Sequence, residues 1–278
     1  MKHQLFNKKP IAIGMIHFSP LEGDSGFENK EMVLNRAKQD LEILLEGGVD
    51  AILFENNFDL DKDEKLTPAK AEHFRELVKE LTPDLDLPWG LVPLWNDFEL
   101  GFRLCKEFGG IMVRVPVFVD DVKTVYGVFK ADAKKVLTAR QQLGADDVMI
   151  LADVHVKHAE MIKPRPLVES LQETIDAGAD AVIITGEWTG DPPDVEECRL
   201  AKETAQDKIA VLTGSGLNAD NLKQYTGVID GCIVGTAFKE GEVDTKIQEG
   251  PNVTNAARRY DLAKVQRFMA IIDKYKNV

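Results

Sequence analysis

Apolar, β-favouring runs alternate with segments of helical periodicity along the whole chain, and this alternation constrains the fold more than any other feature. The apolar runs are residues 11–17, 51–56, 87–95, 111–116, 148–156, 181–187, 209–212 and 228–234. Helices are expected over 31–46, from 68, from 97, over 131–143, 167–177 and 195–204, from 218, and over 260–274. Strands that alternate with helices form a parallel sheet covered by helices. Eight such units in 278 residues, with no composition break, predict the α/β class and a single (β/α)8 (TIM) barrel domain over residues 1–278.

The connections in this pattern are unequal in length. Short turns such as 47–50 and 177–180 lead into strands, whereas long polar segments such as 18–30 and 117–130 follow them. In a (β/α)8 barrel, the loops that follow the strands form the face where enzymes of this fold hold their active sites. We therefore expect the functional residues at the carboxyl ends of the strands.

Two consecutive strands end in turns that contain glycine and a hydroxyl residue, TGSG at 213–216 and GTA at 235–237. Glycine lets backbone N–H groups approach an anion closely, and the N-terminus of a following helix attracts the same charge. The loops after strands 7 and 8 of such barrels frequently bind one phosphate group. The alternative is that the glycines only permit tight turns. The predicted phosphate-binding residues are Gly214, Ser215, Gly216, Gly235 and Thr236.

The fifth apolar run ends in the unusual sequence ADVHVKHA at 152–159. Because side chains alternate along a strand, Asp153, His155 and Lys157 are expected on one face, directed into the barrel or over its mouth. Asp153 and His155 would serve as an acid–base pair or as ligands of a divalent metal, which is the only cofactor that the sequence suggests. The alternative is a buried ion pair that fixes the strand.

Polar side chains at the ends of the other strands add candidates for binding and catalysis. Glu187 joins Asp153, His155 and Lys157 as a candidate catalytic residue. Arg114 lies between two valines, so its charge needs a carboxylate such as Glu55 or an anionic ligand. The candidate substrate-binding residues are His17, Glu55, Asn56, Asn96, Arg114, His158 and Thr185.

The charge balance and the cysteines restrict the partners and the compartment. A net charge of −13 argues against nucleic acid and anionic membranes, which need a basic surface. No apolar run is long enough for a membrane span, and the first ten residues do not resemble a secretory signal. The three cysteines are widely spaced, as expected for reduced thiols in a cytoplasmic protein. The expected partner is a small phosphorylated molecule, and a homo-oligomer is left open.

The chain resembles the BtpA family, which includes SgcQ-type proteins, over nearly its whole length. The resemblance rests on IGMIHFSPLEG at 13–23, EGGVDAILFEN at 46–56, ADVHVKHA at 152–159, ITGEWTGDPPD at 184–194, VLTGSG at 211–216 and GCIVGTAFK at 231–239. The resemblance implies a fold like that of ribulose-phosphate-binding barrels. It also implies a link to photosystem I biogenesis, through a peripheral thylakoid protein, or to nucleosidase activity, but no established reaction.

The combined pattern predicts a cytoplasmic enzyme that acts on a small phosphorylated metabolite, a sugar phosphate or a nucleoside-type compound, by acid–base or metal-assisted chemistry. If the bond is glycosidic, Asp153 or Glu187 would stabilise the oxocarbenium-like charge, and His155 or the other carboxylate would protonate the leaving group. The alternative is a non-catalytic assembly or stability factor, which would need an exposed docking patch and no charged groups inside the barrel mouth.

Overall fold

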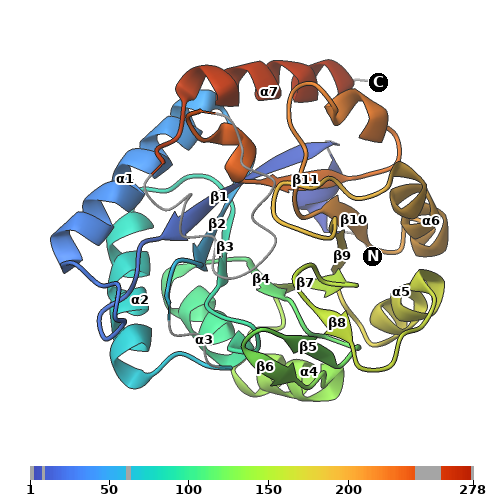
Figure 1. Ribbon diagram of the computed structural model, residues 1–278, viewed down its shortest axis with the longest axis horizontal. Coiled ribbons are helices and arrows are strands. Elements are labelled where there is room, and N and C mark those ends of the chain that lie inside the picture. Colours follow the sequence, from blue (N-terminus) through green and yellow to red (C-terminus); the bar gives the residue numbers. More distant parts are fainter. Residues whose placement is uncertain (1–2, 8–9, 61–63, 242–257, 277–278) are drawn as a thin grey trace.

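The computed structural model describes residues 3–7, 10–60, 64–241 and 258–276. Eight parallel strands close into a barrel in the order β1-β11-β10-β9-β7-β4-β3-β2, as the view down the barrel shows (Figure 1). The predicted (β/α)8 architecture is thereby confirmed. The barrel strands are β1 (Ile11–Phe18), β2 (Ala51–Asn56), β3 (Trp89–Val92), β4 (Met112–Val115), β7 (Met149–Val154), β9 (Ala181–Ile184), β10 (Ala210–Thr213) and β11 (Gly231–Val234).

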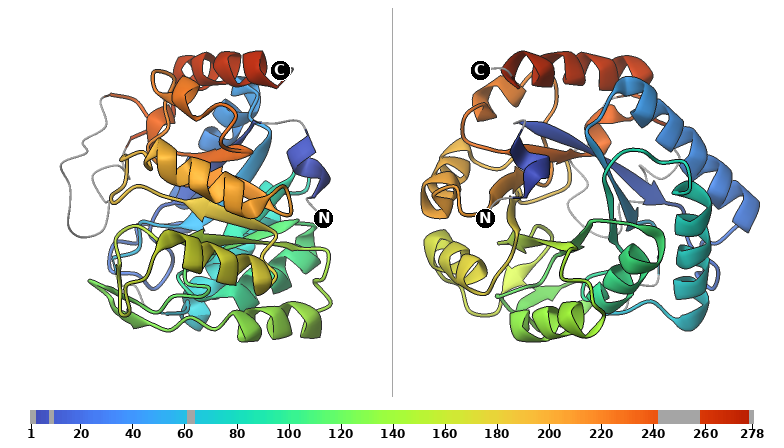
Figure 2. Two further views of the ribbon diagram at one scale, coloured as in Figure 1. Left: turned by 90° about the vertical axis from the view of Figure 1, so that its right-hand side faces the viewer. Right: turned by 180° about the vertical axis from the view of Figure 1, so that it is seen from behind.

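Helices surround the barrel on its outside (Figures 1 and 2). They are α1 (Lys30–Gly47), α2 (Pro68–Leu81), α3 (Phe98–Phe108), α4 (Ala133–Gln142), α5 (Leu167–Asp176), α6 (Val195–Ala205) and α7 (Leu262–Tyr275). Thr67 caps α2 as its position before Pro68 indicates, because its hydroxyl accepts a hydrogen bond from the backbone N–H of Lys70. The sequence also predicts an irregular segment between Glu240 and the last helix, and this segment lies mostly outside the described residues.

The helix expected from residue 218 is not formed as predicted. The chain there makes only a 3-10 turn, η2 (Leu222–Tyr225), and β11 is followed by a second one, η3 (Thr236–Phe238). The Asn218 side chain accepts hydrogen bonds from the backbone N–H groups of Asp220 and Asn221, at 2.8 and 3.1 Å. Such local bonds compete with the helical ladder, so the glycine turn after β10 leads into a short 3-10 turn rather than a long helix.

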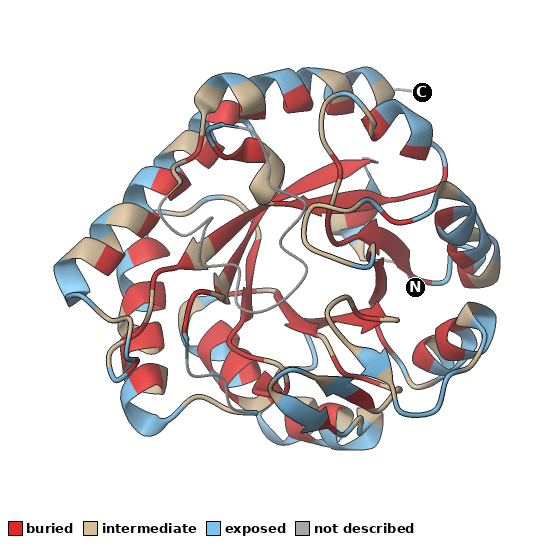
Figure 3. Ribbon diagram, in the orientation of Figure 1, coloured by how far each residue is buried: buried red, intermediate tan, exposed pale blue. Residues whose placement is uncertain are grey.

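Apolar side chains of one parity fill the inside of the barrel, and those of the other parity pack between the barrel and the helices. Figure 3 shows the barrel strands coloured mostly as buried, whereas the surrounding helices mix buried and exposed positions. The inner cluster includes Ile13, Leu53, Met112 and Leu151. At the amino end of the strands, η1 (Gln4–Asn7) lies across the opening, and its Phe6 is fully buried in the same cluster (Figure 2, right). The other end of the barrel is therefore the one that remains open to a ligand.

The long polar connection after β4 contains a hairpin of β5 (Val122–Thr124) and β6 (Gly127–Phe129). With β8 (Glu160–Met161), it forms a small antiparallel sheet that joins the loops after β4 and β7. This sheet lies at the opposite end of the barrel from η1 (Figure 2, left). Residues of the β5–β6 turn, including Tyr126, therefore reach the rim of the barrel mouth.

Candidate active site

A cavity of about 940 Å³ opens at the carboxyl end of the barrel strands. Twelve predicted site residues line it: His17, Glu55, Asn56, Arg114, Lys157, His158, Glu187, Gly214, Ser215, Gly216, Gly235 and Thr236. The other predicted site residues do not line the cavity, namely Asp153, His155, Asn96 and Thr185. The structure thus brings together residues that lie at or after the carboxyl ends of seven different barrel strands.

Charged and polar side chains replace the apolar barrel interior in its last layer, directly beneath the cavity. Arg114 on β4 and Asp153 on β7 form a two-fold hydrogen-bonded ion pair, with Nε–Oδ1 at 2.8 Å and Nη2–Oδ2 at 2.7 Å. The Arg114 side chain is 6% exposed and that of Asp153 is 0% exposed. Burial lowers the pKa of Arg114, but Asp153 and Glu55 outweigh it and raise that pKa above its usual range. Both oxygens of Asp153 are therefore committed to holding the guanidinium group.

His17 on β1 and Glu55 on β2 form a second pair in the same layer, with Nε2 and Oε2 3.1 Å apart. Burial lowers the pKa of His17, so the imidazole is neutral near pH 7 and donates its Nε2 proton to Glu55. Burial raises the pKa of Glu55, but the hydrogen bond from His17 and the charges of Arg114 and Lys157 bring it down to about 2. The second imidazole nitrogen, Nδ1, is buried and has no hydrogen-bond partner among the described residues.

Two lysines line the cavity in a weakly solvated environment. Burial and the charge of Arg114 lower the pKa of Lys157 to about 8, although Glu55 and Asp153 act to raise it. Burial also lowers the pKa of Lys239 to about 8, against the influence of Asp40. The Lys239 ammonium group lies 4.7 Å from the centre of the Phe58 ring, which stabilises a cation by its π-electrons.

The prediction that Asp153, His155 and Lys157 share one strand face is wrong, because β7 ends at Val154. His155 has a φ of 51°, in the left-handed region, and the chain turns there. Its Nε2 lies 3.2 Å from the hydroxyl of Ser170 on α5, on the helix side of the barrel wall. Asp153 and His155 therefore do not meet as an acid–base pair or as ligands of one metal. Across the described ranges, no group of three His, Cys, Asp or Glu residues is arranged to hold a metal ion.

The remaining predicted residues outside the cavity lining support its walls. The Asn96 amide donates to Glu64 Oε1 and to the carbonyl of Lys130, at 3.2 and 3.1 Å, and so joins the loops after β3 and β4. The Thr185 hydroxyl accepts a hydrogen bond from the backbone N–H of Lys157 at 3.1 Å. His158 lines the cavity, and its Nε2 lies 2.7 Å from the hydroxyl of Thr189.

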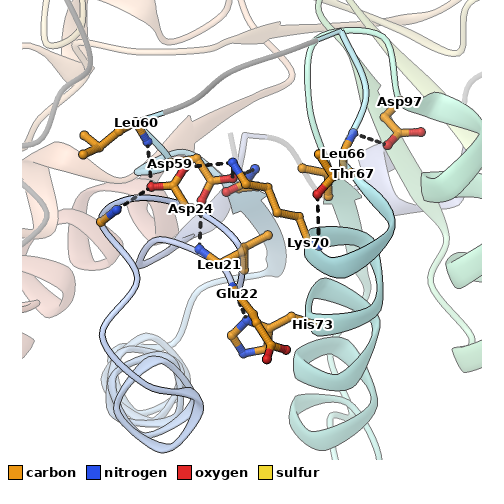
Figure 4. A network of polar contacts seen from close by, with 12 residues as sticks. Leu21, Glu22, Asp24, Asp59, Leu60, Leu66, Thr67, Lys70, His73 and Asp97 are labelled. Atoms are coloured by element: carbon orange, nitrogen blue, oxygen red, sulfur yellow. Dashed lines mark hydrogen bonds and ion pairs between the residues drawn. The ribbon is translucent and has the colours of Figure 1, made fainter.

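A buried ion network, not foreseen from the sequence, fixes the loops after β1 and β2 (Figure 4). Lys70 on α2 contacts Asp24 at 2.8 Å and Asp59 at 3.2 Å, and all three side chains are at most 5% exposed. Asn56, which lines the cavity, donates to Asp59 at 2.9 Å. The network thereby positions Phe58, whose ring contacts His17 and Lys239. The one signal in the sequence is a lysine on the apolar face of α2.

Aromatic side chains line much of the cavity, and they were not predicted from the sequence. Trp95 stacks on Phe129 with ring centres 5.1 Å apart, and Trp188 packs edge-on against His158 at 5.4 Å. Tyr126 reaches the cavity from the β5–β6 turn. Aromatic residues immediately after predicted strands would have been the available signal.

The glycine turns have a structural reason to contain glycine. Gly216 has a φ of 73°, and a Cβ there would lie 2.0 Å from the backbone nitrogen of Pro192. A Cβ on Gly214 would lie 2.7 Å from side chains of Ile183 and Thr185, and one on Gly235 would lie 2.7 Å from the His17 ring. The tight-turn alternative therefore accounts for these glycines. Both turns nevertheless line the cavity, and no described residue accepts a hydrogen bond from the N–H groups of Gly216 and Leu217.

The closed parallel barrel, the cover at its amino end and the polar cavity at its carboxyl end define the class of TIM-barrel proteins. The BtpA family model matches residues 7–263, and the chain belongs to the BtpA family.

Comparisons with individual proteins agree with this assignment. The photosystem I biogenesis protein BtpA of Synechocystis sp. is 33% identical over 239 residues, which cover 85% of this chain and 83% of that protein. The sgc region protein SgcQ of Escherichia coli is 26% identical over 270 residues, 96% of this chain and 95% of that protein. Among solved structures, Mycobacterium tuberculosis tryptophan synthase has a TM-score of 0.61 at 16% identity, covering 98% of this chain and 99% of that chain. This last likeness concerns the fold alone.

None of the described helices has the length and apolar character that crossing a membrane requires.

Proposed function

We propose that the protein is a cytoplasmic enzyme that acts on a small phosphorylated metabolite, a sugar phosphate or a nucleoside-type compound, by acid–base chemistry. This proposal is carried by the layer of charged side chains beneath the cavity. Two members of this layer, Arg114 and Glu55, also line the cavity. Burying ionised groups costs more free energy than burying apolar side chains of the same size, so the fold alone does not need such a layer. Perturbed pKa values in a cleft are typical of functional sites.

In this proposal the phosphate lies between the turns after β10 and β11. The N–H groups of Gly216 and Leu217 are without described acceptors, and they border the cavity together with Thr236. Lys239, close to the same wall, supplies positive charge in a chain with a net charge of −13. Backbone donors in such turns bind anions without needing a basic surface.

The acid–base group in this proposal is His17 rather than His155. With Nε2 donating to Glu55, Nδ1 is buried without a described partner on a residue that lines the cavity, and this proposal assigns to it the role of proton acceptor. The neighbouring Glu55 carboxylate then stabilises the imidazolium that forms, as the third member of a catalytic triad does. If the substrate bond is glycosidic, Glu55 or Glu187 takes the role considered for Asp153, because both line the cavity, as Glu160 and Asp220 also do, whereas Asp153 does not.

One observation favours a second candidate function, the non-catalytic assembly factor. It is the relative from Synechocystis sp., whose name assigns it to photosystem I biogenesis. In that case the cavity would need no phosphorylated ligand, so ligand binding distinguishes the two proposals.

The test is calorimetric titration with inorganic phosphate, ribose 5-phosphate and nucleoside 5′-monophosphates. A Gly216→Asp variant would be hard to interpret, because its side chain collides with Pro192. Thr236 lines the cavity without a positive φ, so Thr236→Asp adds a repelling charge with little backbone strain. We expect Thr236→Asp to lose at least about tenfold in affinity, roughly 1.4 kcal/mol, and the isosteric control Thr236→Val to keep most of it. Failure of every phosphorylated compound to bind the unmodified protein would refute the proposal.

A further inference from the structure

We propose that Lys157 forms an imine with the carbonyl group of an open-chain phosphorylated aldose or ketose. This inference rests on the proposed function, because it names the substrate class of the same cavity. It gives Lys157 the role of nucleophile, and it makes His17 the group that moves the proton next to the new C=N bond.

The position of Lys157 suits a nucleophile. It follows β7 at the carboxyl end of the barrel, lines the cavity, and is anchored through its backbone N–H to Thr185. Its Nζ makes no hydrogen bond or ion pair with any residue that the structure describes. The other enclosed cations contrast with it, because Lys70 contacts two carboxylates and Arg114 is held by Asp153.

The surroundings of Lys157 lower the pKa of its amine below the ordinary value of a lysine. Burial and Arg114 disfavour the ammonium form, while Glu55 and Asp153 oppose them. His17, which the charge of Lys157 also affects, is neutral near pH 7. The net result is a pKa of about 8, which leaves roughly one tenth of the amine unprotonated at pH 7, far more than for an ordinary lysine. A desolvated lysine near another cationic group is the usual form of an activated amine nucleophile.

The chemistry balances without a further reactant. The Nζ lone pair adds to the carbonyl carbon, the C=O π electrons move to oxygen, and a proton passes from nitrogen to that oxygen. The carbinolamine hydroxyl takes a further proton from solvent and leaves as water, while the nitrogen lone pair forms the C=N bond, which gives a protonated imine. The cationic C=N bond withdraws electrons from the adjacent C–H bond, and His17 Nδ1 accepts that proton to give an enamine.

The experiment is reductive trapping on the full-length protein. The protein is incubated with ribose 5-phosphate or dihydroxyacetone phosphate and sodium cyanoborohydride, followed by intact-mass measurement and peptide mapping. We expect one adduct per chain, located on Lys157, at a rate that rises through pH 8 as the amine loses its proton. Lys157→Arg and Lys157→Met should each lose the adduct, while Lys134→Arg, a change of an exposed helix lysine, should keep it. Two variants at position 157 guard against the failure of one of them to fold.

Ribitol 5-phosphate separates this inference from the proposed function, because it carries the phosphate but no carbonyl group. We expect it to bind in the calorimeter and to block the adduct by competition. If it binds while the carbonyl compounds give no adduct on Lys157, the imine is refuted and the phosphorylated-ligand proposal stands. Labelling spread over exposed lysines such as Lys134 would equally refute the imine. If neither ribitol 5-phosphate nor the carbonyl compounds bind, both proposals fail.

Discussion

The Arg114–Asp153 pair gives the sharpest test of the barrel interior. Asp153→Asn keeps the shape of the side chain but removes the charge, and it replaces one acceptor oxygen by an NH2 group that faces the guanidinium donors. Both side chains are almost fully buried, so water cannot compensate. Removing one partner of a buried pair costs about 3–5 kcal/mol. Since Glu55 also acts on Arg114, we expect the lower end, about 3 kcal/mol, or a melting temperature lower by ~6–12 °C.

A double-mutant cycle shows whether this cost comes from the pair itself. Urea unfolding is measured for the unmodified protein, Asp153→Asn, Arg114→Met and the double variant. We expect the double variant to be less destabilised than the two single losses added together, with a coupling of about 1.5 kcal/mol or more. Additive losses to within about 0.5 kcal/mol, or an Asp153→Asn protein that melts like the original, would refute this account of the layer.

The remaining predictions concern Lys157, which lines the cavity, and Lys70, which lies in the buried ion network with Asp24 and Asp59. Because Lys157 has a pKa of about 8 in the folded protein against an ordinary 10.5, the unfolded chain binds more protons between these values, and stability gains from this group as pH rises. Lys157→Met should therefore be more stable than the unmodified protein below pH 8 and lose that advantage by about pH 10.5; a pH-independent difference in urea unfolding would contradict this. Lys70→Met leaves Asp24 and Asp59 buried without their cation and should cost about 3–5 kcal/mol in urea unfolding. The control Lys79→Met, an exposed position on the same helix, should stay within about 0.5 kcal/mol, and equal losses at both positions would contradict the role of the network.

The sequence predicts the barrel and its polar layer because both depend on local periodicity. Each apolar run identifies a strand. The two-residue period assigns Asp153 to the inner face, and the ends of the runs place His17, Glu55 and Arg114 at the same mouth, as in the structure. The period holds only as long as the strand does. His155 adopts a left-handed backbone conformation, which histidine tolerates better than most residues, and nothing in the sequence marks this point as the strand end. Because the strand ends before His155, the His155 side chain lies on the helix side of the barrel wall and not, as predicted, inside with Asp153.

Long-range contacts account for the rest of what the sequence did not predict. The spacing of the glycine turns suggests an anion site, but the close approach of Pro192 to Gly216 joins loops from two different units. Likewise, Lys70 lies on α2, whereas its partners Asp24 and Asp59 lie on the loops after β1 and β2. Such contacts depend on which loops the barrel closure brings together, and a pattern read along the chain does not contain that information.

The order of strands around the barrel determines how the proposed reaction would fit the cavity. The turns proposed to bind phosphate follow β10 and β11, His17 lies on β1 beside β11, and Lys157 follows β7, separated from β10 by β9. Neighbouring strands are ~4.8 Å apart, so Lys157 lies roughly two strand spacings along the wall from the nearer phosphate turn. A phosphate dianion close to Lys157 would raise its pKa and suppress its nucleophilicity, and this separation limits that effect. The arrangement therefore suits a substrate that carries its phosphate at one end and its carbonyl group at the other, with the reacting carbon held between Lys157 and His17.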